Sequence, residues 1–308
     1  MDAPLDPAVA QALKTLPSLD AAGGEADKLR AALRSIYESR KHGAPRAVAS
    51  VTEESVAGAH GALRVRVYRP SPTIVYFHGG GWVAGDLDTH DRVARGIALD
   101  TSAVLVSVDY RQPPETRFPG AFDDALAATR EVIARIDEYG GDKQAVGVAG
   151  DSAGANLAAA TAIALRDDGV ALAGQLLIYP VVDVAGLYSD VKIDSHYPSR
   201  VENRENYFLT LRSMQHFSQL YLADPASASD WRASPLRAPT LRGVAPTVLS
   251  VAHFDPLRDE GLAYADLLSA AGVDIKIHRG PGLIHGYFGM AAAVPAAQTE
   301  VKRVCGDF

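Results

Sequence analysis

The chain has 308 residues, 47% hydrophobic and 22% charged, which is the composition of a folded globular protein rather than a disordered one. Its formal net charge is −7 and it contains no basic run, which argues against nucleic acid or an anionic membrane surface as a partner. A chain of this length can bury one large core or two modest ones.

The first residues, MDAPLDPAVAQALKTL, have neither the basic start nor the unbroken apolar stretch of a signal peptide. The longest apolar run, ANLAAATAIAL at 155–165, is too short to span a bilayer. We therefore expect a cytoplasmic protein without a membrane span. The single cysteine, Cys305, cannot form an internal disulfide, and we expect it to pack or to lie at the surface.

In chain order, residues 1–45 have amphipathic helical patterns with Pro, Gly and charge breaks, and strands and helices then alternate. We expect strands at RVRVYRP (64–70), TIVYFH (73–78), AVLVSVDY (103–110), AVGVAG (145–150), GQLLIYPV (174–181), PTVLSVA (246–252) and DIKIHRG (274–280). We expect helices at 88–100, 118–138, 153–167 and 258–272.

Several of the strand runs are apolar throughout, as in a parallel sheet covered on both faces, whereas the alternation in RVRVYR is typical of an antiparallel edge strand. The order predicts a doubly wound α/β fold, with core segments at 46–185 and 236–308. Residues 1–45 and the insertion 186–235 interrupt this order. They either pack the ends of the sheet or form a lid over its carboxyl edge.

The sharpest motif is GDSAG at 150–154, which joins an expected strand to an expected helix. This is the Gly-x-Ser-x-Gly pattern of a nucleophile elbow, in which a strained turn lifts Ser152 above the sheet. The helix that follows directs its free N–H groups at the same place, so the N–H of Ala153 can meet a developing oxyanion.

A serine hydroxyl needs a histidine base, and that base needs a carboxylate to fix its tautomer. Asp255 and His285 follow the last two expected strands, which gives the chain order serine, acid, histidine that accompanies a nucleophile elbow. The competing histidines, interpreted as packed or solvated, are His196, His216, His253 and His278. The competing acids are Asp259 and Glu260, which suit a helix start, and Asp183, which follows a different strand.

The run YFHGGGW at 76–82 places three glycines directly after an apolar strand. A phosphate cradle would need a following Lys and Ser/Thr, and a dinucleotide site would need Gly-x-Gly-x-x-Gly opening a helix; WVAGDLDTH fits neither. We therefore expect the N–H groups of Gly79 and Gly80 to join that of Ala153 in an oxyanion hole.

Four ordered motifs resemble those of the hormone-sensitive-lipase-type α/β-hydrolases, the bacterial family IV carboxylesterases. They are HGGGW (78–82), GDSAG (150–154), DPLRDEG (255–261) and HGY (285–287). The resemblance implies Ser152 as nucleophile, His285 as base and Asp255 as orienting acid. It also implies an eight-stranded sheet, a cap built from residues 1–45 and 186–235, and a His78 that anchors the glycine loop.

Departures from the family pattern are YRQPPE at 110–115 in place of YRLAPE, Ala155 in place of a glycine, and His253-Phe254 in place of Glu-Tyr. The change at 110–115 affects a structural loop, and the change at His253-Phe254 affects the shape of the pocket. All three departures leave the expected catalytic residues in place. The candidate pocket walls, for each of which plain packing is an equal alternative, are Trp82, Tyr188, Tyr207, Phe208 and Ile284.

These observations predict a serine carboxylesterase that hydrolyses short- to medium-chain esters through an acyl-enzyme, with a small-molecule ester as its partner. They imply no metal and no organic cofactor, and they leave open whether the chain forms a homodimer. Two alternatives remain. One is an amidase or deacetylase with the same triad, and the other is a non-catalytic ligand receptor on this scaffold, although such receptors lack the histidine that His285 supplies.

Overall fold

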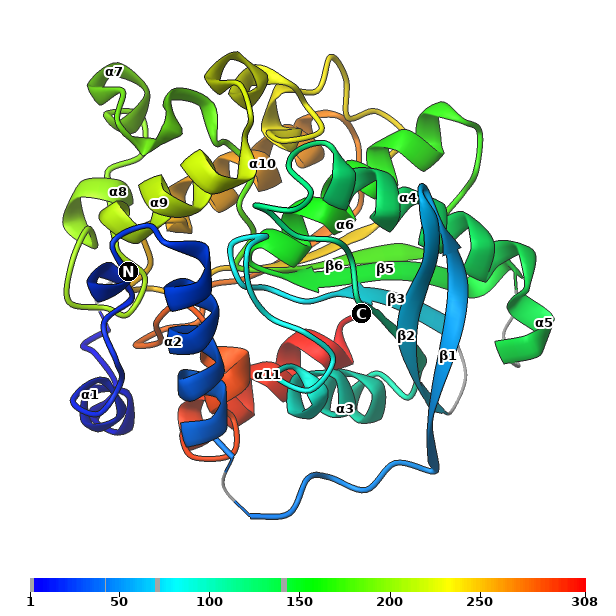
Figure 1. Cartoon of the computed structure of the whole chain (residues 1–308), viewed down its shortest axis with the longest axis horizontal. Helices are drawn as coiled ribbons and strands as arrows, with labels where there is room; N and C mark the ends of the chain where they lie inside the picture. Colours follow the sequence, from blue (N-terminus) through cyan, green and yellow to red (C-terminus); the bar gives the residue numbers. More distant parts are fainter. Residues whose placement is uncertain (1–2, 42, 70–72, 140–142) are drawn as a thin grey trace.

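The computed structural model of the chain describes residues 3–41, 43–69, 73–139 and 143–308. Within these residues, one eight-stranded sheet has the order β1-β2-β4-β3-β5-β6-β7-β8 (Figure 1). The strands are β1 (Ser50–Gly58), β2 (Gly61–Arg69), β3 (Thr73–Phe77), β4 (Val104–Val108), β5 (Val146–Asp151), β6 (Gly174–Ile178), β7 (Thr247–Ser250) and β8 (Ile275–His278). The strands from β4 to β8 across the sheet pair in parallel, and β2 pairs antiparallel with both β1 and β4.

All seven expected strands are present, although Pro70 of the first lies outside the described residues. One expectation was wrong: β2 is not an edge strand, because β1 covers its free side. Sequence analysis missed β1, whose SVTEESVAG carries two adjacent glutamates and buries one residue, Val56. Such a half-exposed ribbon lacks a clear alternation of hydrophobic and polar residues.

Helices cover both faces of the sheet, as a doubly wound fold requires (Figure 1). One face carries α4 (Gly120–Ala134), α6 (Ala153–Asp167) and α10 (Arg258–Ala270), and the other carries α3 (Asp91–Asp100) and α11 (Pro295–Gly306). Every residue of β3, β4, β5 and β6 is buried, which explains their continuous apolar sequences.

Two expectations about helices need revision. The expected helix at 118–138 is two helices, because the backbone leaves helical geometry at Arg135 before α5 (Ile136–Tyr139) begins. The helix α11 was not expected at all; it buries Cys305, which therefore packs inside the protein.

The short 3-10 helices are η1 (Leu19–Ala22), η2 (Lys143–Ala145), η3 (Ala185–Tyr188), η4 (Pro225–Ser229), η5 (Pro235–Arg237) and η6 (Tyr287–Met290).

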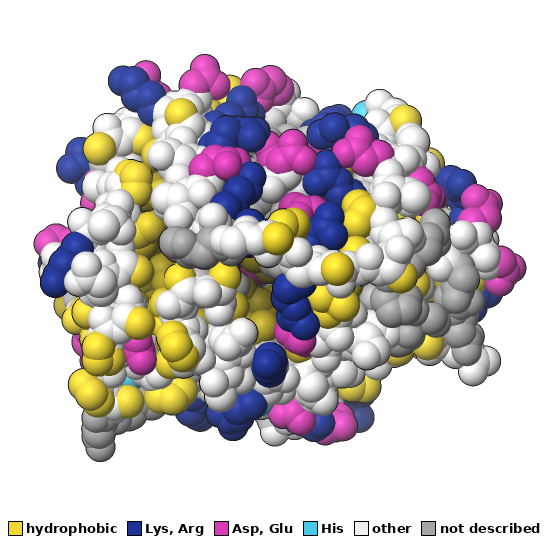
Figure 2. All heavy atoms as spheres, turned by 90° about the horizontal axis from the view of Figure 1, so that it is seen from below, with side chains coloured by type: hydrophobic (Ala, Val, Ile, Leu, Met, Phe, Trp, Pro, Cys, Tyr) yellow, Lys and Arg dark blue, Asp and Glu magenta, His cyan; other side chains and the backbone are white. Residues whose placement is uncertain are grey.

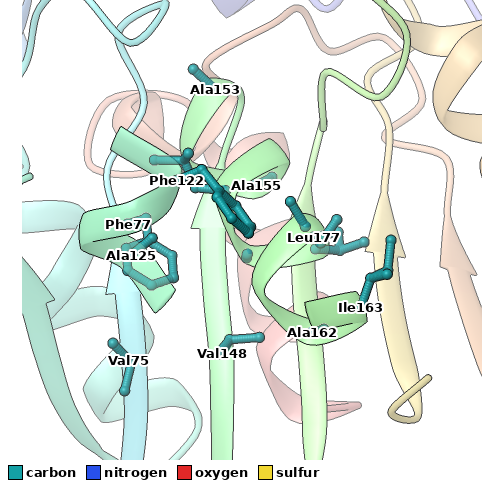
Figure 3. Close-up of a cluster of buried hydrophobic side chains, with 14 of the residues drawn as sticks. Val75, Phe77, Phe122, Ala125, Val148, Ala153, Ala155, Ala162, Ile163 and Leu177 are labelled. Carbon is teal, nitrogen blue, oxygen red and sulfur yellow. The ribbon is translucent and has the colours of Figure 1, made fainter. Parts of the chain in front are cut away.

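Small residues allow α6 to lie directly on the sheet. All residues of this helix from Ala153 to Leu165 are buried, and most are alanines. Figure 3 shows Ala155 and Ala162 of the helix among side chains of the central strands, such as Val148 and Leu177. This close packing fixes the N-terminus of α6 at the carboxyl end of β5.

The N-terminal helices and the insertion pack together. The helices of these segments are α1 (Pro7–Leu13), α2 (Ala26–Ser39), α7 (Val191–Asp194), α8 (Ser199–Glu202) and α9 (Leu211–Tyr221). Leu29, Leu33 and Ile36 of α2 form one buried cluster with Val83 of the glycine loop and Phe217 of α9. The N-terminal segment and the insertion, which are far apart in the sequence, therefore meet over the loop that follows β3. No helix among the residues that the structure describes has the length and apolar character to cross a bilayer.

A buried ion-pair network attaches the insertion to α10. The guanidinium of Arg200 is fully buried, and it lies 2.6 Å from Glu260 and 2.6 Å from Asp194. It also donates to the carbonyl oxygen of Asp183 at 2.7 Å. Burial raises the pKa of Glu260 to about 7, and the charge of Arg200 opposes that rise. Glu260 stands at the helix start that the sequence indicated, but its partner is an arginine of the insertion.

Replacing Arg200 should destabilise the fold, because Glu260 and Asp194 would lose their buried counter-charge. We expect Arg200→Met to lower the free energy of unfolding by about 3–5 kcal/mol at neutral pH. The matched control is Arg130→Met, which removes an exposed ion pair with Asp168 and should cost less than about 1 kcal/mol. Urea unfolding measures both variants, and equal losses would contradict the assignment.

Candidate active site

Three residues distant in sequence meet at the carboxyl edge of the sheet. Ser152 follows β5, Asp255 follows β7 and His285 follows β8. The Nε2 atom of His285 lies 2.9 Å from the Ser152 hydroxyl oxygen, and its Nδ1 atom lies 2.7 Å from a carboxylate oxygen of Asp255. Asp255 and His285 are 1% and 5% exposed, so little water competes for these hydrogen bonds.

Ser152 has the strained backbone that the motif predicts. Its φ of 56° and ψ of −119° are rare for a residue with a side chain, and such strain costs about 1–3 kcal/mol. The two flanking glycines make the turn possible. A Cβ on Gly150 would lie 2.2 Å from the backbone of Gly154, and a Cβ on Gly154 would lie 1.9 Å from the carbonyl oxygen of Phe77.

A short backbone bridge aligns the loops that carry the acid and the histidine. Phe254 and Ile284 pair in parallel beyond the ends of β7 and β8, one residue before Asp255 and His285. The Asp255 carboxylate accepts the N–H of Leu257 at 2.9 Å through one oxygen, which leaves its other oxygen for His285. A proton on Nδ1 then leaves Nε2 as the acceptor for the serine hydroxyl.

The N–H of Gly79 is already engaged, which makes the expected oxyanion role of this residue wrong. It donates to a carboxylate oxygen of Asp151 at 2.8 Å. In contrast, the N–H groups of Gly80 and Gly81 donate to no acceptor among the described residues. Both of these glycines line the cavity that contains Ser152. The available donors of the loop are therefore shifted by one residue from the expected pair.

Different neighbours leave no space for a side chain at Gly80 and at Gly81. Gly80 has a φ of 121°, and a Cβ there would lie 2.0 Å from the carbonyl oxygen of Ala84. Gly81 has a φ of 62°, and a Cβ there would lie 2.3 Å from the ring of Phe217. The first constraint comes from the fold of the loop itself and the second from α9, so a larger residue at either position would move the loop.

His78 holds the start of this loop. Its Nδ1 atom lies 2.8 Å from the carbonyl oxygen of Gly79, and its ring stacks on that of Tyr110 at 4.4 Å. The Tyr110 hydroxyl donates to the carbonyl oxygen of His78 at 2.7 Å. These contacts agree with the anchoring role that the family resemblance implied.

Asp151 ties the glycine loop to the elbow and was not singled out from the sequence. Its carboxylate accepts both the N–H of Gly79 and the hydroxyl of Tyr76, the latter at 2.5 Å. Burial raises the pKa of Asp151, and these two hydrogen bonds oppose the rise. The position of Asp151 beside Ser152 in GDSAG was a usable signal, but its partner could not be identified without the fold.

A cavity of about 50 Å³ opens beside Ser152 and His285. Of the expected walls, Trp82, Tyr188 and Phe208 line it, whereas Tyr207 and Ile284 do not. Ile284 is instead fully buried in the backbone bridge between the loops. The ring of Tyr207 packs against that of Phe254, with centroids 4.9 Å apart.

Sequence analysis missed most of the apolar lining. These residues, from the N-terminal helices, the insertion and the strand-end loops, are Leu19, Leu33, Tyr37, Tyr179, Val181, Leu209, Met214, Phe217 and Leu257. The spacing of Met214 and Phe217 on one face of α9 was a usable signal. Leu19, Leu33 and Tyr37 gave none, because nothing local indicates that the N-terminal helices return to the sheet edge.

The comparisons with known proteins agree with this architecture. A family profile described as "alpha/beta hydrolase fold" matches residues 74–289. Carboxylesterase NlhH of Mycobacterium tuberculosis is 37% identical over 97% of this chain and 93% of its own length. Esterase LipI of the same organism is 36% identical, over 97% and 92%. A solved esterase from Pyrobaculum calidifontis is similar with a TM-score of 0.88 and 36% identity, covering 99% of this chain and 98% of the other.

The fold and the matched segment define an α/β hydrolase. More specifically, the chain belongs to the hormone-sensitive-lipase-type family IV and is a carboxylic ester hydrolase.

Gly80→Ala should lower kcat by at least about 10²-fold, the typical cost of losing one oxyanion donor, because the new Cβ would push the loop away from the Ala84 carbonyl. The matched control is Gly306→Ala at the end of α11, where a Cβ would meet nothing within 4 Å. Steady-state hydrolysis of a p-nitrophenyl ester compares the two. Wild-type kcat in Gly80→Ala would rule out this loop as a catalytic element.

Proposed function

We propose that Ser152 is the nucleophile of an acyl-enzyme mechanism, with His285 as general base and acid and Asp255 as the orienting carboxylate. The observation that carries the proposal is the hydrogen-bonded chain from Ser152 through His285 to Asp255 at the wall of a cavity. His285 takes the hydroxyl proton as Ser152 attacks the ester carbonyl, and it then gives that proton to the leaving alcohol. Water repeats the sequence and releases the acid.

The oxyanion of each tetrahedral intermediate is held by the N–H groups of Gly80, Gly81 and Ala153. Two findings support this set in place of the one that begins at Gly79. The N–H of Gly79 is bound to Asp151, and Ala153 begins α6, where an N–H has no partner within the helix. The glycine loop and the start of α6, which directly follows Ser152, supply the proposed donors.

The acyl group that fits is short. A cavity of about 50 Å³ with mostly apolar walls has little room for a long hydrocarbon chain. A relative of Pseudomonas putida named ethyl acetate hydrolase, 35% identical over 79% of this chain and 76% of its own length, favours a small ester. Residues 1–45 and 186–235 supply much of this wall, which supports their role as a two-part cap.

His285→Ala should lower kcat by at least about 10³-fold while the protein still unfolds cooperatively, because the side chain takes part in chemistry rather than in the core. His196→Ala is the matched control, since His196 is an exposed histidine of the insertion. The measurements are ester turnover and thermal unfolding of both variants. If His285→Ala kept more than a tenth of wild-type turnover, another group would have to be the base.

A series of p-nitrophenyl esters tests the size of the acyl pocket. We expect kcat/KM to be highest for acetyl to hexanoyl esters and to fall with longer acyl chains, because the small cavity beside Ser152 favours short acyl groups. Matched anilides in the same series test the amidase alternative. A kcat/KM that still rises at the dodecanoyl ester would contradict the short-chain assignment.

A further inference from the structure

Arg40, directly after α2, carries a buried positive charge without a counter-ion. The residue is 8% exposed, and its Nε and Nη2 atoms are buried with no hydrogen-bond acceptor among the described residues. Its Nη1 atom reaches the carbonyl oxygen of Gly286 at the long distance of 3.4 Å. No carboxylate in the described part of the chain forms an ion pair with Arg40, in contrast to the fully buried Arg200.

Aromatic rings and a glycine hold this guanidinium in place. Its central carbon lies 4.9 Å from the ring centroid of Phe208 and 5.8 Å from that of Tyr37. A Cβ on Gly289 would lie 3.1 Å from its Nη1 atom, so the glycine leaves the space that the guanidinium fills. Burial lowers the pKa of Arg40, and the charge of Asp151 opposes this shift without accepting a hydrogen bond. Burying a charge is costly unless a partner compensates it.

A cavity of about 200 Å³ opens beside Arg40 between α3, η6 and α11. Its other charged lining residues are Arg46, Arg92, Lys302 and Asp100, so four cations face one carboxylate among the described residues. That carboxylate is already bound at both oxygens by Arg46, at 2.8 Å each. This balance is the reverse of the net charge of the chain. Figure 2 views the molecule from the side on which α3 and α11 lie, where Lys and Arg side chains stand beside hydrophobic ones.

We propose that this cavity is a binding site for a small organic carboxylate, with Arg40 as its principal ligand. The Nε–H and Nη2–H donors of the guanidinium have no acceptor among the described residues. Once the buried head group turns toward the cavity, they match the two oxygens of a carboxylate in a fork geometry. Apart from Gln298, the remaining side chains of the wall are apolar, among them Val93, Phe288, Ala291 and Val301, so they suit a short hydrocarbon body better than a fully hydrated inorganic ion. Short carboxylates are also the class of product that a carboxylic ester hydrolase releases.

Two residues, Phe208 and Gly286, connect the proposed carboxylate site with the proposed catalytic centre. Phe208 packs on Arg40 with its ring and also lines the cavity of Ser152. Gly286, whose carbonyl oxygen Arg40 contacts, directly follows His285. A carboxylate that draws the Arg40 guanidinium toward itself therefore changes the support of both residues. Binding should lower kcat rather than compete with the ester.

The test uses the full chain with butanoate as the probe, at constant ionic strength. We expect butanoate to raise the melting temperature of the wild type and to lower its maximal rate of ester hydrolysis. In Arg40→Gln we expect the melting-temperature shift to disappear. We also expect the constant for inhibition by butanoate to rise at least about tenfold in this variant. Competitive inhibition from product binding at Ser152 should persist in this variant. Lys302→Gln, an exposed substitution at the rim, should weaken both effects partially without risk to the fold.

Arg130→Gln, remote from the cavity, is the control and should respond to butanoate like the wild type. Inorganic phosphate provides the second arm, and a melting-temperature shift larger than that of butanoate would overturn the assignment to a carboxylate. Equal shifts in the wild type and in Arg40→Gln, or no shift in the wild type, would show that the aromatic rings alone support the buried guanidinium and would overturn the site. Loss of all esterase activity in His285→Ala would leave this proposal unaffected.

Discussion

The turn from β5 into α6 is the constraint on which the rest of the site depends. Neither Gly150 nor Gly154 can carry a Cβ, because the backbones of the turn, of α6 and of β3 lie in direct contact there. The chain can pass this point only with Ser152 in a strained conformation, which the close packing of α6 on the sheet maintains. The same helix also brings its first N–H groups, which have no partner within the helix, next to the serine. The position of the hydroxyl and the position of one proposed oxyanion donor therefore both depend on the packing of α6.

The glycine loop, the second proposed oxyanion element, is fixed to the same turn by one hydrogen bond. Asp151 directly precedes Ser152, and its carboxylate accepts the N–H of Gly79. That contact removes one donor from the glycine loop, but it sets the direction of the two that follow. The loop is held again at His78, which binds the carbonyl oxygen of the same glycine. The first glycine thus serves as an attachment point on both its N–H and its C=O side, and the next two are left to face the cavity.

The sequence was most informative where a local constraint and a function coincide. The continuous apolar strands, the elbow glycines and the order of Ser152, Asp255 and His285 are all visible without a fold, because each follows from a short segment. The roles that sequence analysis misassigned depend on partners far along the chain. Gly79 was taken as a donor because its acceptor, Asp151, lies 72 residues away. Ile284 resembles a pocket wall beside the histidine, and only the pairing with Phe254 shows that it holds two loops in register. Similarly, β1 is recognisable only through its partner β2.

The insertion does more than close the cavity, because it also supports the loop of the proposed acid. Ser199 of α8 donates to the carbonyl oxygen of Pro256 at 2.9 Å, and Asn203 donates to that of Asp255 at 3.3 Å. Arg200 lies between these two residues and anchors the same helix to Glu260. The segment that supplies Tyr188 and Phe208 to the cavity is therefore in contact with the loop of Asp255, whose carboxylate binds His285. A change that widens the cavity by shifting α8 will also move Asp255, so pocket size and catalytic geometry cannot vary independently in this fold.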